Sequence, residues 1–221
     1  SGFSLDKAGE NIAYIHGTMT DPCQVAVLSP ARDQPLQLTA LNQELFNSID
    51  LGSFEEVWFK GADDNDLQGW IIKPPNFEPE KQYASIMEIH GGPLAQYGFY
   101  FMHEFFYLAA QGYVVYFCNP RGGTGYGEAH AKAIYHGKWG TVDYEDLMVW
   151  ADYMEKQPYV DPDNMGVTGG SYGGYMTVWI IGHTHRFKAA VSQRCVSNLI
   201  SMWGSSDFNW SFQEIFDDKA P

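Results

Sequence analysis

The chain has 221 residues, of which 45% are hydrophobic and 16% aromatic, so it carries enough apolar side chain for a packed core and is not a disordered chain. Its 13 Lys and Arg against 27 Asp and Glu give a net charge of −14. This acidity argues against a nucleic-acid-binding protein and against binding to an anionic membrane surface, because both need a basic face.

Residues 1–50 contain short apolar segments separated by turn signals. Alternation predicts a strand at 11–16, followed by a strand at 24–28 and a candidate third strand at 35–38, with proline-containing turns between them. Two or three small strands are too few to form a stable unit alone. We therefore interpret residues 1–50 as the end of a larger domain, and 47–54 as a linker.

From residue 54 onward, strands alternate with helices, a pattern typical of an α/β fold with a mostly parallel sheet covered on both faces. We assign residues 51–221 to this second domain. The expected strands are 54–60, 68–73, 84–90, 113–118, 165–168 and 187–192, and the expected helices are 99–111, 141–157, one that follows residue 171, and 196–203. The first two strands form a hairpin, and its acidic turn lacks the spacing of a calcium loop.

The segment 119–127 reads Asn-Pro-Arg-Gly-Gly-Thr-Gly-Tyr-Gly. Its glycines do not fit the patterns of nucleotide-binding loops, so we expect a shaped loop on the face where the parallel strands end. Arg121 of this loop and Arg194 are candidates for binding a substrate carboxylate or carbonyl, although structural salt bridges are favoured for both.

The expected helix 141–157 begins with a potential cap at Thr141 and acidic residues at Asp143, Glu145 and Asp146. Acidic side chains in the first turn interact favourably with the helix dipole. We therefore expect these carboxylates to support the helix and not to form a catalytic pair.

The most informative segment, 165–176, reads Met-Gly-Val-Thr-Gly-Gly-Ser-Tyr-Gly-Gly-Tyr-Met. Gly169, Ser171 and Gly173 fit Gly-x-Ser-x-Gly, the nucleophile elbow, in which a serine sits on a sharp turn between a strand and a helix. The alternative is a glycine-rich turn whose serine only caps the helix. A strand before Ser171 and a helix after it favour the elbow.

A nucleophilic serine needs a histidine base and a carboxylate that orients the histidine. In hydrolases with this elbow, the acid and then the histidine follow the serine along the chain. Here the last histidines are His183 and His185, and a helix of twelve residues would place His183 about 18 Å from Ser171. The acid and the base are therefore expected beyond Pro221, in a longer protein of which this chain is a fragment.

Unlike the acid and the histidine, both donors of an oxyanion hole have candidates within this sequence. The N–H of Tyr172, directly after the nucleophile, is the first expected donor. The second is expected in the loop after the strand 84–90, where His90-Gly91-Gly92-Pro93 resembles the His-Gly-Gly motif of hydrolases, and Gly92 is our candidate.

Three motifs together resemble the prolyl oligopeptidase family of serine peptidases, in particular its acylaminoacyl peptidase branch: segment 169–176, segment 90–93 and segment 119–127. The resemblance implies a truncated α/β-hydrolase fold preceded by the last strands of a β-propeller, with Ser171 as nucleophile and Tyr172 and Gly92 as oxyanion donors. It also implies short peptides as substrates and an acyl-enzyme intermediate on Ser171.

Two other functions stay open, a carboxylesterase of the same fold and a catalytically inactive interaction module. We expect no cofactor, no metal and no nucleic-acid or membrane partner, whereas a homo-oligomer is possible. Three cysteines without paired spacing (Cys23, Cys118, Cys195), and a start that does not resemble a signal peptide, favour a cytoplasmic protein.

Overall fold

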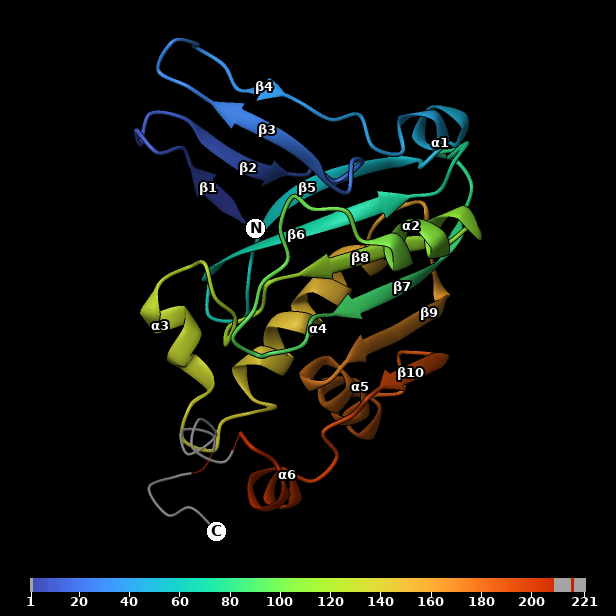
Figure 1. The fold of residues 1–221 in the computed structure, drawn as a ribbon. Coiled ribbons are helices and arrows are strands. Elements are labelled where there is room, and N and C mark those ends of the chain that lie inside the picture. Colours follow the sequence, from blue (N-terminus) through green and yellow to red (C-terminus); the bar gives the residue numbers. More distant parts are fainter. Residues whose placement is uncertain (1, 209–215, 217–221) are drawn as a thin grey trace.

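The computed structural model describes residues 2–208 and 216, which form two sheets (Figure 1). The smaller sheet is antiparallel, in the order β1-β2-β3-β4. Its strands are β1 (Phe3–Leu5), β2 (Ile12–His16), β3 (Gln24–Leu28) and β4 (Leu36–Gln37). The strands predicted at 11–16 and 24–28 are confirmed, the first beginning one residue later than expected, and the third is shorter than expected.

The larger sheet has six strands in the order β10-β9-β7-β8-β6-β5. The four strands β10, β9, β7 and β8 are parallel, whereas β6 and β5 run antiparallel to their neighbours. The bounds are β5 (Ser53–Lys60), β6 (Asp66–Lys73), β7 (Tyr83–Ile89), β8 (Val114–Cys118), β9 (Val160–Gly170) and β10 (Ala189–Gln193). The predicted mostly parallel sheet and its opening hairpin are confirmed.

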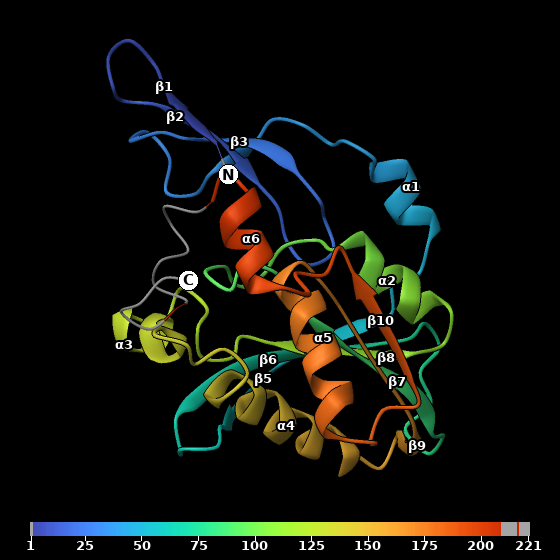
Figure 2. The ribbon, with the colours of Figure 1, turned by 90° about the horizontal axis from the view of Figure 1, so that it is seen from below.

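Helices cover both faces of this sheet, as Figure 2 shows from below. Their bounds are α1 (Gln43–Ser48), α2 (His103–Ala110), α3 (Glu128–Ala131), the 3-10 turn η1 (Lys132–Ile134), α4 (Val142–Glu155), α5 (Tyr172–His183) and α6 (Leu199–Ser205). Helix α2 lies on one face, and α4 and α5 lie on the other.

The side chains of β6 show how one strand serves both faces, because successive residues of a strand point in opposite directions. Ile71 packs with Trp150 of α4, whereas Trp70 and Ile72 pack with Phe105 of α2. All five side chains are buried. A strand that is buried on both faces has a nearly continuous run of apolar residues in its sequence, and these runs allowed the strands to be predicted.

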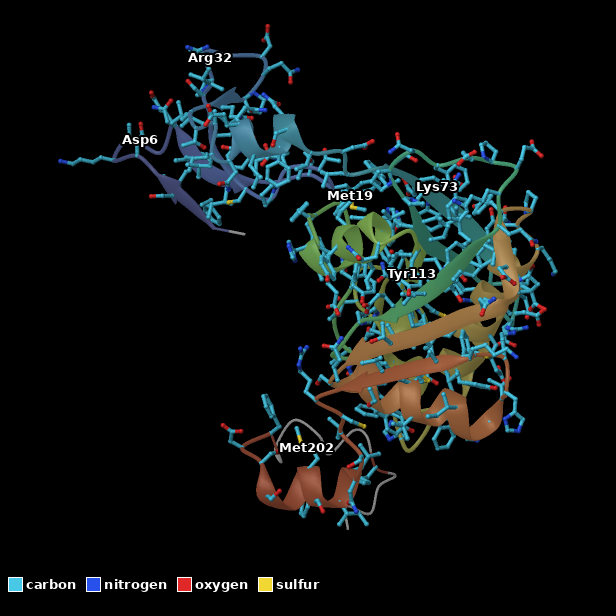
Figure 3. The ribbon with its side chains drawn as sticks, turned by 90° about the vertical axis from the view of Figure 1, so that its right-hand side faces the viewer. Asp6, Met19, Arg32, Lys73, Tyr113 and Met202 are labelled. Atoms are coloured by element: carbon cyan, nitrogen blue, oxygen red, sulfur yellow. The ribbon has the colours of Figure 1, made fainter. Side chains whose placement is uncertain are left out.

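The two sheets meet at Met19, in the connection between β2 and β3. Met19 is buried and belongs to the apolar cluster formed by Trp70, Tyr97 and Phe105 of the larger sheet and its α2 face. Figure 3 labels Met19 at this junction.

Several predicted boundaries were wrong. Part of the expected linker is helix α1, which has no buried residue and therefore no apolar periodicity to reveal it. Helix α2 begins at His103 and not at residue 99. Thr141 does not cap α4 with its side chain, because its hydroxyl donates to the carbonyl of Lys138.

Candidate active site

The elbow predicted at Ser171 is present. Strand β9 ends at Gly170, helix α5 begins at Tyr172, and Ser171 connects them with φ 59° and ψ −117°. Positive φ is uncommon for a residue with a Cβ atom and marks local strain. Two backbone bonds hold this conformation: the Ser171 N–H donates to the Gln193 carbonyl, and the Ser171 carbonyl accepts from the Tyr175 N–H, each at 3.0 Å.

Glycine is required beside the serine because α5 approaches β7 very closely. A Cβ atom on Gly173 would lie 2.0 Å from the carbonyl oxygen of Ile89, and one on Gly169 would lie 2.6 Å from the same oxygen. Both distances are far below a permissible contact. The motif glycines therefore set the distance between the nucleophile turn and the end of β7.

The loop after β7 passes directly beside Ser171. A Cβ atom on Gly91 would lie 3.3 Å from the Ser171 Cβ and 3.1 Å from the Gly170 carbonyl oxygen. The peptide group that joins Gly91 to Gly92 carries the Gly92 N–H, the donor expected from the sequence. Gly92 itself is more exposed and has φ 124°, a conformation that favours glycine.

The side chain of Tyr172 points into the core, away from the nucleophile. Its ring is 1% exposed and packs edge-to-face against Trp139, with centroids 4.9 Å apart. Its hydroxyl donates to Oδ2 of Asp143 in α4, and the same oxygen accepts the Gly140 N–H at 3.0 Å. Burial raises the pKa of the Tyr172 hydroxyl well above its ordinary value.

Two of the three acidic residues at the start of α4 have a different environment from the one that we expected. Glu145 is exposed, but Asp143 and Asp146 are completely buried and bind specific partners. Burial raises the pKa of Asp143, although its hydrogen bond from Tyr172 partly offsets this rise. The expectation that these acids only favour the helix dipole was therefore wrong for Asp143 and Asp146.

Asp146 anchors the glycine-rich loop through Arg121. The Arg121 guanidinium donates to both carboxylate oxygens of Asp146 at 2.8 Å, and the Arg121 backbone N–H adds a third bond at 3.0 Å. Arg121 also pairs with Asp63 in the hairpin turn. The predicted structural salt bridge of Arg121 is confirmed.

The glycine-rich loop in turn supports the loop that follows Gly91 and Gly92. The buried Asn119 side chain accepts the Tyr97 N–H at 2.7 Å and donates to the Tyr97 carbonyl at 3.0 Å. The Thr124 N–H donates to the Ala95 carbonyl at 2.9 Å. The segment 119–127 is thus a shaped loop beside the candidate site, as expected.

A cavity of about 350 Å³ opens at Ser171. Its lining includes Ser171, Gly91, Glu88, Glu104, Gln193 and Arg194. Arg194 lies against Gly170 and donates to the Gln193 side chain at 3.2 Å, and it forms no ion pair among the described residues. The expected salt bridge of Arg194 is therefore absent from the described part of the chain.

None of the histidines in the described residues is hydrogen-bonded to Ser171. His90 lines the same cavity as Ser171, but its Nδ1 is bonded to the Gly91 carbonyl and its Nε2 is buried without a partner among the described residues. His183 stacks on Trp179 at the far end of α5, with centroids 4.4 Å apart. The described residues thus provide the strained turn at Ser171 with the Gly91-Gly92 loop beside it, but no histidine bonded to Ser171.

The sequence analysis missed the buried contact of Asp143 and did not consider Glu88. Asp143 binds a residue 29 positions away, and nothing local in the sequence indicates that contact. Glu88 is the one charged residue of the mostly apolar strand β7, two positions before the His-Gly-Gly motif, and this was a signal that could have been read. Within residues 2–208 and 216, no group of three or more potential ligands is arranged for a metal, and no helix has the length and apolarity to cross a bilayer.

Comparison with known proteins gives a consistent result. Residues 99–220 match the sequence profile of the Prolyl oligopeptidase family. "Uncharacterized peptidase YuxL" of Bacillus subtilis is 43% identical over 84% of this chain, and "Dipeptidyl-peptidase 5" of Porphyromonas gingivalis is 30% identical over 83%. The chain spans only 28% and 27% of the lengths of these two relatives.

The solved structures agree with the sequence relatives. Acylaminoacyl peptidase from Pyrococcus horikoshii superimposes with a TM-score of 0.90 and 30% identity, over 99% of this chain and 35% of that protein. An acylaminoacyl peptidase in complex with Z-Gly-Gly-Phe-chloromethyl ketone gives the same TM-score with 31% identity and the same coverage. Together with the observed sheet, these matches show a partial α/β-hydrolase fold.

Proposed function

Because the chain belongs to the prolyl oligopeptidase family, we propose that it is the nucleophile-bearing part of a serine peptidase that cleaves short peptides through an acyl-enzyme on Ser171. The observation that carries this proposal is the strained turn at Ser171, held between β9 and α5 beside the Gly91-Gly92 loop. A partly exposed serine on such a turn can approach a peptide carbonyl from the cavity that it lines.

In the proposed reaction, Ser171 attacks the carbonyl carbon, and the resulting oxyanion accepts hydrogen bonds from the Tyr172 and Gly92 N–H groups. Two observations support these donors: Tyr172 is the first residue of α5, and the Gly91–Gly92 peptide group lies beside Ser171. Loss of one such donor typically costs about 10²–10³ in rate. The amine then leaves, and water releases the acyl group from the serine.

The histidine and the acid are proposed to come from residues that follow this chain in a longer protein. Two facts support this arrangement. No histidine of the described residues bonds to Ser171, and the chain covers about a quarter of the curated relatives' length. The antiparallel sheet β1–β4 is proposed to be the last blade of a β-propeller, which would restrict substrates to short peptides.

Labelling by a fluorophosphonate tests the nucleophile. We expect the full-length protein to be labelled at Ser171, the Ser171→Ala variant to lose labelling and peptidase activity, and a Ser48→Ala control to keep both. Labelling at another serine would contradict the proposal. Rates on an aminoacyl anilide and on a simple ester separate the peptidase from the alternative carboxylesterase.

The 221-residue chain by itself is a second test. It should bind neither fluorophosphonate nor substrate covalently, because its described residues give Ser171 no base. Strong labelling of Ser171 in this chain alone would show that the base lies within it. An unlabelled full-length protein would instead favour the inactive interaction module.

A further inference from the structure

The loop that carries the expected Gly92 donor begins with a buried histidine. The His90 side chain is 6% exposed, and its Nδ1 atom lies 2.7 Å from the carbonyl oxygen of Gly91. A carbonyl oxygen only accepts hydrogen bonds, so Nδ1 carries a proton and is the donor. Burial lowers the pKa of His90, and the nearby His130 adds to this shift. The imidazole is therefore neutral, with its one ring proton on Nδ1.

The carbonyl that His90 binds belongs to the same peptide group as the Gly92 N–H. This peptide group is planar and trans, so its C=O and N–H point in opposite directions. A bond that fixes the direction of the Gly91 carbonyl therefore also fixes the direction of the Gly92 N–H. It polarises the amide as well, which strengthens the N–H as a donor. The group lies beside Ser171, because a Cβ atom on Gly91 would be 3.3 Å from the Ser171 Cβ.

Two consecutive glycines make the orientation of this peptide group easy to change. Rotation of a peptide plane alters ψ of the residue before it and φ of the residue after it, and glycine tolerates a wide range of both angles. Gly92 already has φ 124°. Since the backbone itself imposes little preference, the orientation depends on contacts such as the bond from His90.

The imidazole ring is itself held by residues from two other segments. Tyr97 packs edge-to-face against it, with centroids 5.3 Å apart, and the Asn119 side chain binds both the N–H and the carbonyl of Tyr97. Gly123 of the glycine-rich loop lies close to the ring, since a Cβ atom there would be 3.5 Å from Nε2. These contacts all lie within the described residues, and the enclosed ring leaves almost no surface for a further segment to cover.

We propose that His90 is a positioning residue of the peptidase site: its Nδ1–H holds the Gly91–Gly92 peptide group so that the Gly92 N–H faces the oxyanion. The inference rests on the proposed peptidase function and gives a role in it to a histidine that is not bonded to Ser171. The Gly92 donor gains importance as the substrate oxygen becomes negatively charged, so loss of its positioning should lower kcat far more than it changes KM.

The test separates the hydrogen bond from the ring with three variants of the full-length protein. His90→Asn loses the ring, but its amide nitrogen can take the place of Nδ1 as the donor. His90→Leu has nearly the same shape as His90→Asn without a donor, and His90→Phe keeps a ring without a donor. His185→Leu, at an exposed histidine outside the cavity, is the matched control.

The values of kcat and KM on an aminoacyl anilide are measured for every variant, and unfolding midpoints show which variants are folded at the assay temperature. Complete loss of an oxyanion donor costs about 10²–10³ in rate, and a donor that is present but misaligned should cost less. We expect His90→Leu and His90→Phe to lower kcat by about 10- to 100-fold with little change in KM, and His90→Asn to stay within about threefold of the wild type. Either donor-free variant is sufficient for the comparison if the other does not fold.

Several results would overturn the positioning role while leaving the peptidase proposal intact. They are a kcat of His90→Asn as low as that of His90→Leu, wild-type kcat in a donor-free variant, a change in KM alone, and failure of both donor-free variants to fold. The control should match the wild type. A wild-type protein that neither hydrolyses the anilide nor reacts with a fluorophosphonate at Ser171 would instead overturn the peptidase proposal itself.

Discussion

Tyr172 and Asp143 are joined by a hydrogen bond of 2.5 Å between two completely enclosed side chains, from helices that lie on the same face of the sheet. Tyr172 also carries, on its backbone, one of the two proposed oxyanion donors. The bond therefore connects the start of α4 to the residue that follows the nucleophile, through a phenol ring packed against Trp139.

We predict that Tyr172→Phe lowers the free energy of unfolding by about 1–3 kcal/mol, because Asp143 loses a donor in a buried setting. In the full-length protein, Ser171 should still react with a fluorophosphonate, since the amide of residue 172 is retained. The matched control is Tyr175→Phe, whose hydroxyl is only partly buried and donates to a carbonyl at 3.4 Å. Denaturant unfolding of both variants provides the measurement, and equal losses would refute the special role of the Asp143 bond.

A second prediction concerns the close approach of α5 to β7. Gly173→Ala would place a methyl group 2.0 Å from the Ile89 carbonyl oxygen, so helix and strand must separate. Overpacking of a core typically lowers the free energy of unfolding by about 1–3 kcal/mol, and we expect Gly173→Ala to reach or exceed the upper end of this range. In the full-length protein the variant should also lose fluorophosphonate labelling of Ser171.

Gly182→Ala in the same helix is the control, because nothing lies within 4 Å of a Cβ atom there. Alanine should leave the stability of α5 unchanged or raise it by about 0.5–1 kcal/mol through its helix propensity. Thermal unfolding and labelling of the two variants should differ sharply. Similar behaviour would mean that the elbow tolerates a wider gap than the structure indicates.

The third prediction concerns the buried Asp146 and its partner Arg121. Asp146→Ala should cost about 3–5 kcal/mol, because it leaves the Arg121 guanidinium without its two-pronged partner. Arg121→Lys, with Asp146 kept, should not retain the wild-type stability, since a lysine cannot bind both carboxylate oxygens with a planar fork. The exposed pair Glu128–Lys132 is the control, and Lys132→Ala should change the unfolding transition far less. Comparable losses at the two pairs would contradict this ranking.

The fourth prediction is a pH dependence of stability set by Glu88. Its pKa is about 8 in the folded protein, above its ordinary value of 4.5, so the folded state holds the proton more tightly than the unfolded chain does. The stability that Glu88 contributes is greatest below pH 4.5 and falls as pH rises toward 8, by up to about 1.4 kcal/mol per pH unit.

Glu88→Gln should therefore become progressively more stable than the wild type between pH 4.5 and 8, in the absence of substrate. Unfolding midpoints measured across this range give the difference, and Glu80→Gln should remain parallel to the wild type. A difference that does not change with pH would mean that Glu88 is ionised in the folded protein throughout.

Local sequence patterns predicted most strands of the larger sheet and the turn at Ser171. The strands β7 and β8 are mostly apolar runs, and β9 ends at Gly170 directly before Ser171. The Gly-x-Ser-x-Gly spacing follows from a steric requirement that any such turn imposes. Ser171 and the Gly91-Gly92 loop were found for this reason, since their signals are contained within a few consecutive residues.

Long-range contacts were not predictable in the same way. Asp143 and Asp146 looked like ordinary acids of a first helical turn, and their burial depends on Tyr172 and Arg121, which lie 29 and 25 residues away. Helix α1 was not predicted for a different reason: none of its residues is buried, and its sequence carries no apolar stripe.

The order of strands in the larger sheet has a further consequence. Gly92 and Tyr172 are 80 positions apart in the sequence, yet they follow β7 and β9, which are direct neighbours in the sheet. The geometry between them is thus set by a single strand pairing, and β8, α3 and α4 lie outside that pair. Evolution can lengthen or shorten the surface segments of this intervening stretch without moving one proposed donor relative to the other, whereas a one-residue slip between β7 and β9 would separate them at once.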